Sequence, residues 1–166
     1  LVPPDHPAFY AAEIGRAEAL AGKGDAEGAV AVLIALAEAR DELMVVHLSL
    51  GDQYRRMDRW EDAAAAYDRA LDRVTTIDGR HWIIFFNRGT VLHKLDQWDR
   101  AEADFRKSLE LNPDQPLVLN YLGYSLVERG EKLDEALAMI ERAIEGQPDS
   151  GFIIDSLALS LIHISE

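Results

Sequence analysis

The stretch from Gly89 to Gly123 reads GTVLHKLDQWDRAEADFRKSLELNPDQPLVLNYLG, and its two glycines stand about 34 residues apart, a spacing typical of helical repeats. Between the glycines lie Ala101, Phe105 and Ser108, and their three offsets from Gly89 recur elsewhere in the chain. Small and aromatic residues at these offsets predict two helices, the second packed closely against the first.

The same spacing is found in other parts of the chain. Around Gly51, the residues at the three offsets are Ala63, Tyr67 and Ala70. After Gly123 the pattern runs one place late, at Ala136, Ile140 and Ala143. A weaker copy begins at Ala17, which precedes Gly51 by one full period, and a half copy begins near Gly151. A fixed period of this length is the mark of a helical repeat array.

Each repeat predicts a pair of antiparallel helices. Pro113 and Pro148 end two of the second helices, because proline has no N–H to donate and cannot continue a helix. Glycine and alanine at the matching places of the two helices allow their backbones to approach closely. The helices are expected at residues 8–22, 25–38, 43–57, 60–73, 81–95, 98–111, 115–129, 133–146 and 150–164.

These residues resemble the tetratricopeptide repeat family, whose period is about 34 residues. The resemblance implies an all-α fold, a right-handed α-solenoid of antiparallel helix pairs, forming one array over residues 1–166. Its units are expected at residues 8–41, 42–76, 82–114 and 115–149, with a half unit at 150–166. The first unit departs from the pattern in lacking the glycine and the final proline, and four extra residues lie near Thr75–His81.

Composition excludes several classes of function. Seventeen Lys and Arg stand against 30 Asp and Glu, a formal net charge of −13, which disfavours nucleic acid and anionic lipid as partners. No cysteine is present, and no apolar run is long enough to span a membrane. Because the chain opens Leu1-Val2-Pro3-Pro4, with no Met, we expect it to be a fragment of a longer protein.

No motif predicts catalysis, a cofactor or a metal. The glycines of Gly22–Gly28 follow a predicted helix rather than a strand, so a turn is a better interpretation than a phosphate loop. No two of the five histidines stand at metal-ligand spacing, and His47 occupies a position that packs inside a helix pair. Paired carboxylates recur where second helices begin, where the helix dipole favours them. We therefore predict a protein that is not an enzyme.

The resemblance implies that a partner binds on the concave face, which the first helix of each pair lines. The residues expected there are Arg55, Arg56, Phe86, Asn87, His93, Lys94, Asn120, Tyr121 and Tyr124. Cations, amides and aromatic rings together suit an extended peptide with an acidic or carboxylate end. The alternative is that these are only solvated groove residues, because repeat arrays often bind their partners elsewhere.

The predicted function is that of a non-catalytic scaffold or adaptor that holds a protein or an extended peptide. The alternative is the repeat arm of a larger enzyme, a glycosyltransferase or protease, whose catalytic domain lies outside this sequence. The segments Asn120–Leu126 and Asp155–Leu157 are similar to proteobacterial multi-repeat adaptors, some of them exported. That similarity favours the bacterial periplasm over the cytoplasm.

The last residues, Leu159–Glu166, lack the tyrosine and the turn that a further repeat would carry. We therefore expect the final helix to be truncated there. Ile154 and Leu157 are expected to pack on the helix before it. The opposite face, left apolar and exposed, would promote self-association of the chain.

Overall fold

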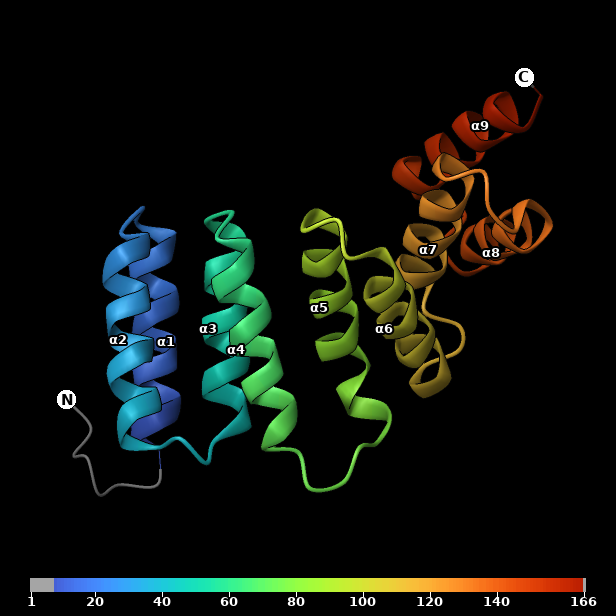
Figure 1. Ribbon diagram of the computed structural model, residues 1–166. Helices are drawn as coiled ribbons and strands as arrows, with labels where there is room; N and C mark the ends of the chain where they lie inside the picture. Colours follow the sequence, from blue (N-terminus) through green and yellow to red (C-terminus); the bar gives the residue numbers. More distant parts are fainter. Residues whose placement is uncertain (1–7, 166) are drawn as a thin grey trace. The chain divides into compact units, whose positions relative to one another are not determined.

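The computed structural model describes residues 8–165, and every regular element in that range is helical. Figure 1 shows α1 (Phe9–Gly22), α2 (Ala26–Ala39), α3 (Met44–Arg56), α4 (Trp60–Asp72), α5 (Trp82–Lys94), α6 (Trp98–Leu111), α7 (Pro116–Glu128), α8 (Leu133–Gly146) and α9 (Gly151–Ser165). A short 3-10 helix at Gly79–His81 precedes α5. Each α-helix boundary lies within one residue of its predicted place, so the all-α repeat fold is confirmed.

The helices divide between two compact units. The first unit comprises the described residues up to Ile77 together with Asn87–Ala101, and the second comprises Asp78–Phe86 and the described residues from Glu102 onward. Helices α5 and α6 therefore contribute one part to each unit. Within the units, consecutive helices pair as the repeat predicts, α1 with α2, α3 with α4 and α7 with α8.

The signature glycines lie where two helices come closest. A methyl group added at Gly51 would lie 2.7 Å from the ring of Tyr67. One added at Gly123 would lie 2.7 Å from the backbone oxygen of Ala136 and 2.8 Å from Ile140. All three distances are shorter than van der Waals contact, so only glycine allows this approach. The predicted reason for the glycine spacing is confirmed.

The turns inside the helix pairs use a left-handed backbone. Gly24 has φ 88° in the first turn, and Asp58 and Asp96 each have φ 57° in the second and third turns. The fourth turn, which carries the extra residue, contains Gly130 at φ 67° and Lys132 at φ 47°. Aspartate and lysine thus occupy a conformation that L side chains disfavour and glycine does not.

Helix α9 packs through a different stripe from the one expected. Ile153 is buried against Leu119 and Ala143, whereas Ile154 is 46% exposed and Leu157 only partly buried. The prediction that Ile154 packs inward is wrong, because residues at a helical spacing of three and four from Ile153 define the inner face. The predicted exposed apolar face is present, with five large side chains between 46% and 61% exposed: Phe152, Ile154, Leu159, Leu161 and Ile162.

Candidate partner-binding surface

The nine residues predicted to face a partner lie on α3, α5 and α7, as expected, but they differ widely in exposure. Five belong to the first unit: Arg55, Arg56, Asn87, His93 and Lys94. Four belong to the second unit: Phe86, Asn120, Tyr121 and Tyr124. The two sets are therefore described separately.

In the first unit, a hydrogen-bonded group joins α3, α4 and α5, and we call it the Asp52 network. The hydroxyl of Tyr67 donates to Asp52 Oδ1 over 2.6 Å, and Asn87 Nδ2 donates to the same oxygen over 2.9 Å. Arg55 Nε donates to the Tyr67 hydroxyl over 3.2 Å. Burial, followed by the nearby Asp52 carboxylate, raises the pKa of Tyr67 far above its usual value. Tyr67 therefore stays a neutral donor.

The Asp52 network changes what two predicted residues can do. Asn87 is 7% exposed, and its amide is already bonded to Asp52. Arg55 lies 3.8 Å from Asp52 and is bonded to Tyr67. Both side chains are therefore occupied within the fold. The sequence did not predict these contacts, because the position of a residue on its own helix does not reveal which side chain it meets on the neighbouring helix.

Two predicted cations of the first unit remain available. Arg56 and Lys94 are exposed, and neither makes a hydrogen bond or ion pair with any residue in the range 8–165. His93 is half-buried, with its ring edge-on to Trp98 at a centroid distance of 5.5 Å. Among its predicted residues, the first unit thus presents two uncommitted positive charges on a chain that is strongly acidic overall.

In the second unit, an aromatic group packs between α5, α6 and α7. Phe86 lies 5.8 Å from the ring of Tyr121 in an edge-on geometry and 6.1 Å from that of Phe105. Tyr121 and Phe105 are 5.2 Å apart. Since Phe86 is only 7% exposed and Phe105 is fully buried, these two rings stabilise the helix packing.

Tyrosines are the accessible predicted residues of the second unit. Tyr121 and Tyr124 are half-buried, and burial together with the nearby Glu128 carboxylate raises the pKa of both hydroxyls. Asn120, by contrast, is fully buried, and its Nδ2 donates to Ser156 Oγ over 3.2 Å. The interpretation that Asn120 offers its amide to a partner therefore does not hold, because α9 covers the side chain.

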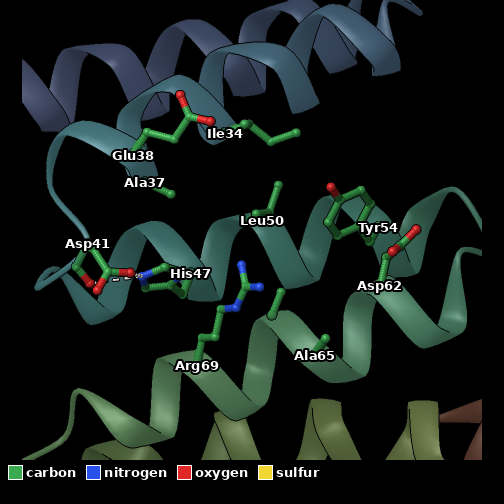
Figure 2. A pocket seen from close by; sticks show the side chains of 11 residues that line it. Ile34, Ala37, Glu38, Asp41, His47, Leu50, Tyr54, Asp62, Ala65 and Arg69 are labelled. Atoms are coloured by element: carbon green, nitrogen blue, oxygen red, sulfur yellow. Dashed lines mark hydrogen bonds and ion pairs between the residues drawn. The ribbon is translucent and has the colours of Figure 1, made fainter.

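The first unit also contains a groove that the sequence did not predict. Residues of α2, α3 and α4 line it (Figure 2), and its volume is about 530 Å³. Ala37, Ala65 and Ala66 are too short to fill the space between the two second helices. Its lining carries the carboxylates of Glu38, Asp41 and Asp62 together with the cation Arg69. Small residues on facing helices were the only sequence signal for this groove.

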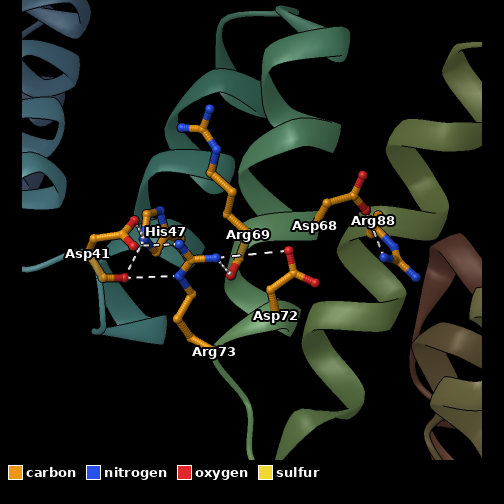
Figure 3. A network of polar contacts seen from close by, with 7 residues as sticks. All are labelled: Asp41, His47, Asp68, Arg69, Asp72, Arg73 and Arg88. Atoms are coloured by element: carbon orange, nitrogen blue, oxygen red, sulfur yellow. Dashed lines mark hydrogen bonds and ion pairs between the residues drawn. The ribbon is translucent and has the colours of Figure 1, made fainter.

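Beside that groove, charged side chains fix the connection between α2 and α3. Figure 3 shows Arg73 donating to Asp41 Oδ2 over 2.5 Å and to the Asp41 backbone oxygen over 3.0 Å. Buried His47, confirmed as a packing residue, has its Nε2 2.9 Å from that backbone oxygen. The Arg73 hydrogen bond lowers the pKa of Asp41. Each of these groups has a structural partner, which favours a structural role over a catalytic one.

Two further features bear on function. Within residues 8–165, no three His, Asp or Glu side chains gather closely enough to hold a metal ion. None of the helices in this range combines the length and the apolar character needed to cross a membrane.

Solved structures share this arrangement of helices. MamA superposes with a TM-score of 0.81 at 19% identity, covering 96% of this chain and 85% of that one. YrrB, described as a TPR protein with an unusual peptide-binding site, superposes with a TM-score of 0.73 at 23% identity, covering 92% of this chain and 76% of that one. At these identities the likeness establishes the fold.

Sequence comparison adds a relative and a family. Protein O-mannosyl-transferase Tmtc1 of Drosophila melanogaster is 31% identical over 91 residues, which cover 54% of this chain but only 11% of that protein. The tetratricopeptide repeat pattern matches residues 48–116 and again residues 86–151. Because those matches together cover more than half of the sequence, the chain belongs to the tetratricopeptide repeat family.

Proposed function

We propose that this chain is a non-catalytic scaffold that binds an extended peptide or a partner protein on exposed surfaces of its first helices. The observation that carries the proposal is the pair of uncommitted cations, Arg56 and Lys94, on an acidic chain. Each cation lies in the last turn of its helix, where it interacts favourably with the helix dipole, and because it has no carboxylate partner it also attracts an acidic ligand to the surface. The half-buried rings of Tyr121 and Tyr124 supply apolar contact area in the second unit.

The proposal predicts binding of acidic peptides that depends on the two cations. Peptides selected from a random display library against the chain should be enriched in Asp and Glu. The double variant Arg56→Glu and Lys94→Glu should bind them at least about tenfold more weakly, since two attractive charges become repulsive. Lys23→Glu is the matched control, because Lys23 is an exposed cation in the turn after α1.

Equal binding by the double variant and the Lys23→Glu control would overturn this assignment, provided that both melt like the parent chain. Selection of peptides without acidic residues would contradict the proposed ligand chemistry. Failure to select any peptide would count against peptide binding itself.

A second candidate function is the repeat arm of a glycosyltransferase. It is favoured by the similarity to Tmtc1, although the matched region spans only 11% of that protein. The reading frame on either side of the sequence tests it directly. A transferase domain there would support the enzyme-arm function, and mannosyl transfer by the whole protein with and without this region would measure what the repeats contribute. Adjoining sequence without such a domain would leave the scaffold as the function.

Self-association through α9 is a further proposal for the partner of this chain. Its five exposed large apolar side chains form the kind of surface that promotes association. Replacing Leu161 and Ile162 by glutamate should shift sedimentation toward the monomer at high protein concentration. Identical sedimentation of parent and variant would show that this face does not mediate association.

A further inference from the structure

A small polar cavity lies in the first unit, between α1 and α3. Its volume is about 40 Å³, more than the space that a single water molecule needs. Ala17 and Leu33, both buried, form an apolar base. Ile14 also lines it, and the polar part of the lining comes mostly from α3: Glu18, Ser49, Asp52, Gln53 and Arg56.

The side-chain amide of Gln53 indicates that the cavity is a binding site. The residue is 5% exposed, yet its side-chain amide bonds to no residue that the structure describes. Neither amide atom is fully buried, so water can satisfy the group until a ligand that donates to its oxygen replaces that water. Glu18 and Ser49, on the same cavity, likewise have no side-chain partner among the described residues.

Asp52 adds a carboxylate whose position is fixed. Its Oδ1 accepts from the buried Tyr67 hydroxyl and from Asn87, while its Oδ2 accepts from no residue in the described range. The side chain is 30% exposed and lines the cavity. The Asp52 network therefore holds one free oxygen ready for a donor without further ordering of the side chain.

We propose that this cavity binds the ammonium group of a lysine side chain supplied by a partner polypeptide, a specificity that rests on the proposed scaffold function. An ammonium group has three N–H donors and no acceptor. The cavity offers acceptors in the carboxylates of Glu18 and Asp52, the Gln53 amide oxygen and the Ser49 hydroxyl, and its only charged donor is Arg56. A ligand carboxylate would instead face two carboxylates.

The one cation on the lining is Arg56, which is exposed and able to extend into solvent, whereas the Asp52 carboxylate is held in place. Arg55, at 3.8 Å from Asp52 Oδ1, is bonded to Tyr67 on the same side of that carboxylate. Glu18 has no cation paired with it in the described part of the chain and is the expected main contact of the ammonium.

Nuclear magnetic resonance of the full chain tests the cavity without a known partner. The probes are the Nα-acetyl, N-methylamide derivatives of lysine, norleucine and glutamine, added separately to ¹⁵N-labelled protein. The lysine compound should shift the side-chain NH₂ signals of Gln53 and the backbone signal of Ser49. Norleucine, which has the same apolar stem without the charge, should leave both unchanged.

A matched pair of variants completes the experiment. Glu18→Gln should weaken the lysine response by about two- to fivefold, as expected for one partly exposed charge pair. Glu61→Gln, at an exposed glutamate at the start of α4, should leave it unchanged. No response to lysine, an equal response to norleucine or glutamine, or an unchanged response in Glu18→Gln would each overturn the proposal. The acidic-peptide selection described above fails or succeeds separately, because it depends on Arg56 and Lys94 and uses a different ligand.

Discussion

The two units solve the same problem differently, which is how to place a polar side chain between successive first helices. In the first unit, Asp52 of α3 lies against Asn87 of α5. The Asn87 amide and the Tyr67 hydroxyl both donate to the same carboxylate oxygen of Asp52. In the second unit, Asn120 of α7 meets Ser156 of α9. The Oδ1 of Asn120 and the hydroxyl of buried Ser160, one turn after Ser156 in α9, have no partner among the described residues. We call this second group the Asn120 network.

The difference teaches that the repeat geometry does not by itself satisfy the polar groups that it buries. The Asp52 network combines a charged acceptor with two neutral donors, and hydrogen bonds to charged groups are the stronger kind. The Asn120 network leaves acceptors unfilled in a fully buried place, at a cost of about 1–3 kcal/mol each. We therefore expect the contact between α3 and α5 to be the more stable of the two.

The largest test of this comparison is Asp52→Leu. It leaves the buried Tyr67 hydroxyl and the Asn87 amide without their acceptor, so we expect a loss of about 2–4 kcal/mol in the free energy of unfolding. Denaturant unfolding followed by circular dichroism measures it. Asp52→Asn, which keeps an acceptor oxygen, is the control and should lose less. Equal losses in the two variants would mean that the network contributes little beyond packing.

At the Asn120 network, removing the polar side chain should increase stability rather than reduce it. Asn120→Leu removes a buried amide whose oxygen is unsatisfied, and Ser156 retains its own acceptor in the Phe152 backbone oxygen at 3.0 Å. The free energy of unfolding should rise by about 0.5–1.5 kcal/mol, or stay unchanged if the extra volume is poorly accommodated. Amide hydrogen exchange of α9 should slow in parallel. A loss of more than about 1 kcal/mol would show that the Asn120 network stabilises the fold after all.

A smaller effect, in the second unit, should depend on pH. In the second unit, guanidinium nitrogens of Arg106 on α6 lie 2.8 Å from a carboxylate oxygen of Glu102, on the same helix, and 2.8 Å from one of Glu135 on α8. Burial raises the pKa of Glu102, but hydrogen bonds from Lys132 and Arg106 outweigh burial, so the pKa of Glu102 is lowered on balance. The hydrogen bond from Arg106 also lowers the pKa of Glu135. Carboxyls with a lowered pKa stabilise the fold above their unfolded value of about 4.3, and this is lost as the pH falls through the folded pKa.

Arg106→Met should therefore cost about 0.5–1 kcal/mol at neutral pH, a modest value because these groups are partly exposed. The difference in melting temperature between parent and variant should shrink and disappear as the pH falls through the lowered pKa values of both carboxyls. Thermal melts across that range measure it. A difference that persists in acid would assign the effect to the packing of the arginine stem.

The sequence predicted the helices and their order well, because period and glycine placement are set by backbone contact. Gly51 and Gly123 had to lie against a second helix, and they do. The orientation of side chains toward the next pair was harder to predict. Asn87 and Asn120 were both expected to face a partner, but one bonds to Asp52 and the other to Ser156. Those contacts depend on which residue the following helix presents, and a repeat pattern does not specify it.

The charged part of the candidate site was predicted better than its amide and aromatic parts. Arg56 and Lys94 are exposed as expected, since a long cation at these positions reaches solvent in any packing. Phe86 was expected as an anchor for a ligand, but it is buried among Phe105 and Tyr121. An aromatic ring adjacent to the core finds partners within the fold first, and only its neighbours in three dimensions reveal this.

The left-handed turn residues leave room to engineer this array. Gly24 occupies the left-handed position of the first turn, whereas Asp58 and Asp96 occupy the equivalent positions of the next two turns. Both aspartates are exposed, so Asp58→Gly and Asp96→Gly would relieve the backbone without removing a buried contact. Because glycine also gains freedom in the unfolded chain, we expect a gain of no more than about 0.5 kcal/mol for each. Melting of the double variant measures it, and a loss would show that the aspartate side chains contribute more than the strain costs. Repeated across many copies, such small gains would raise the thermal tolerance of a long array built from this unit.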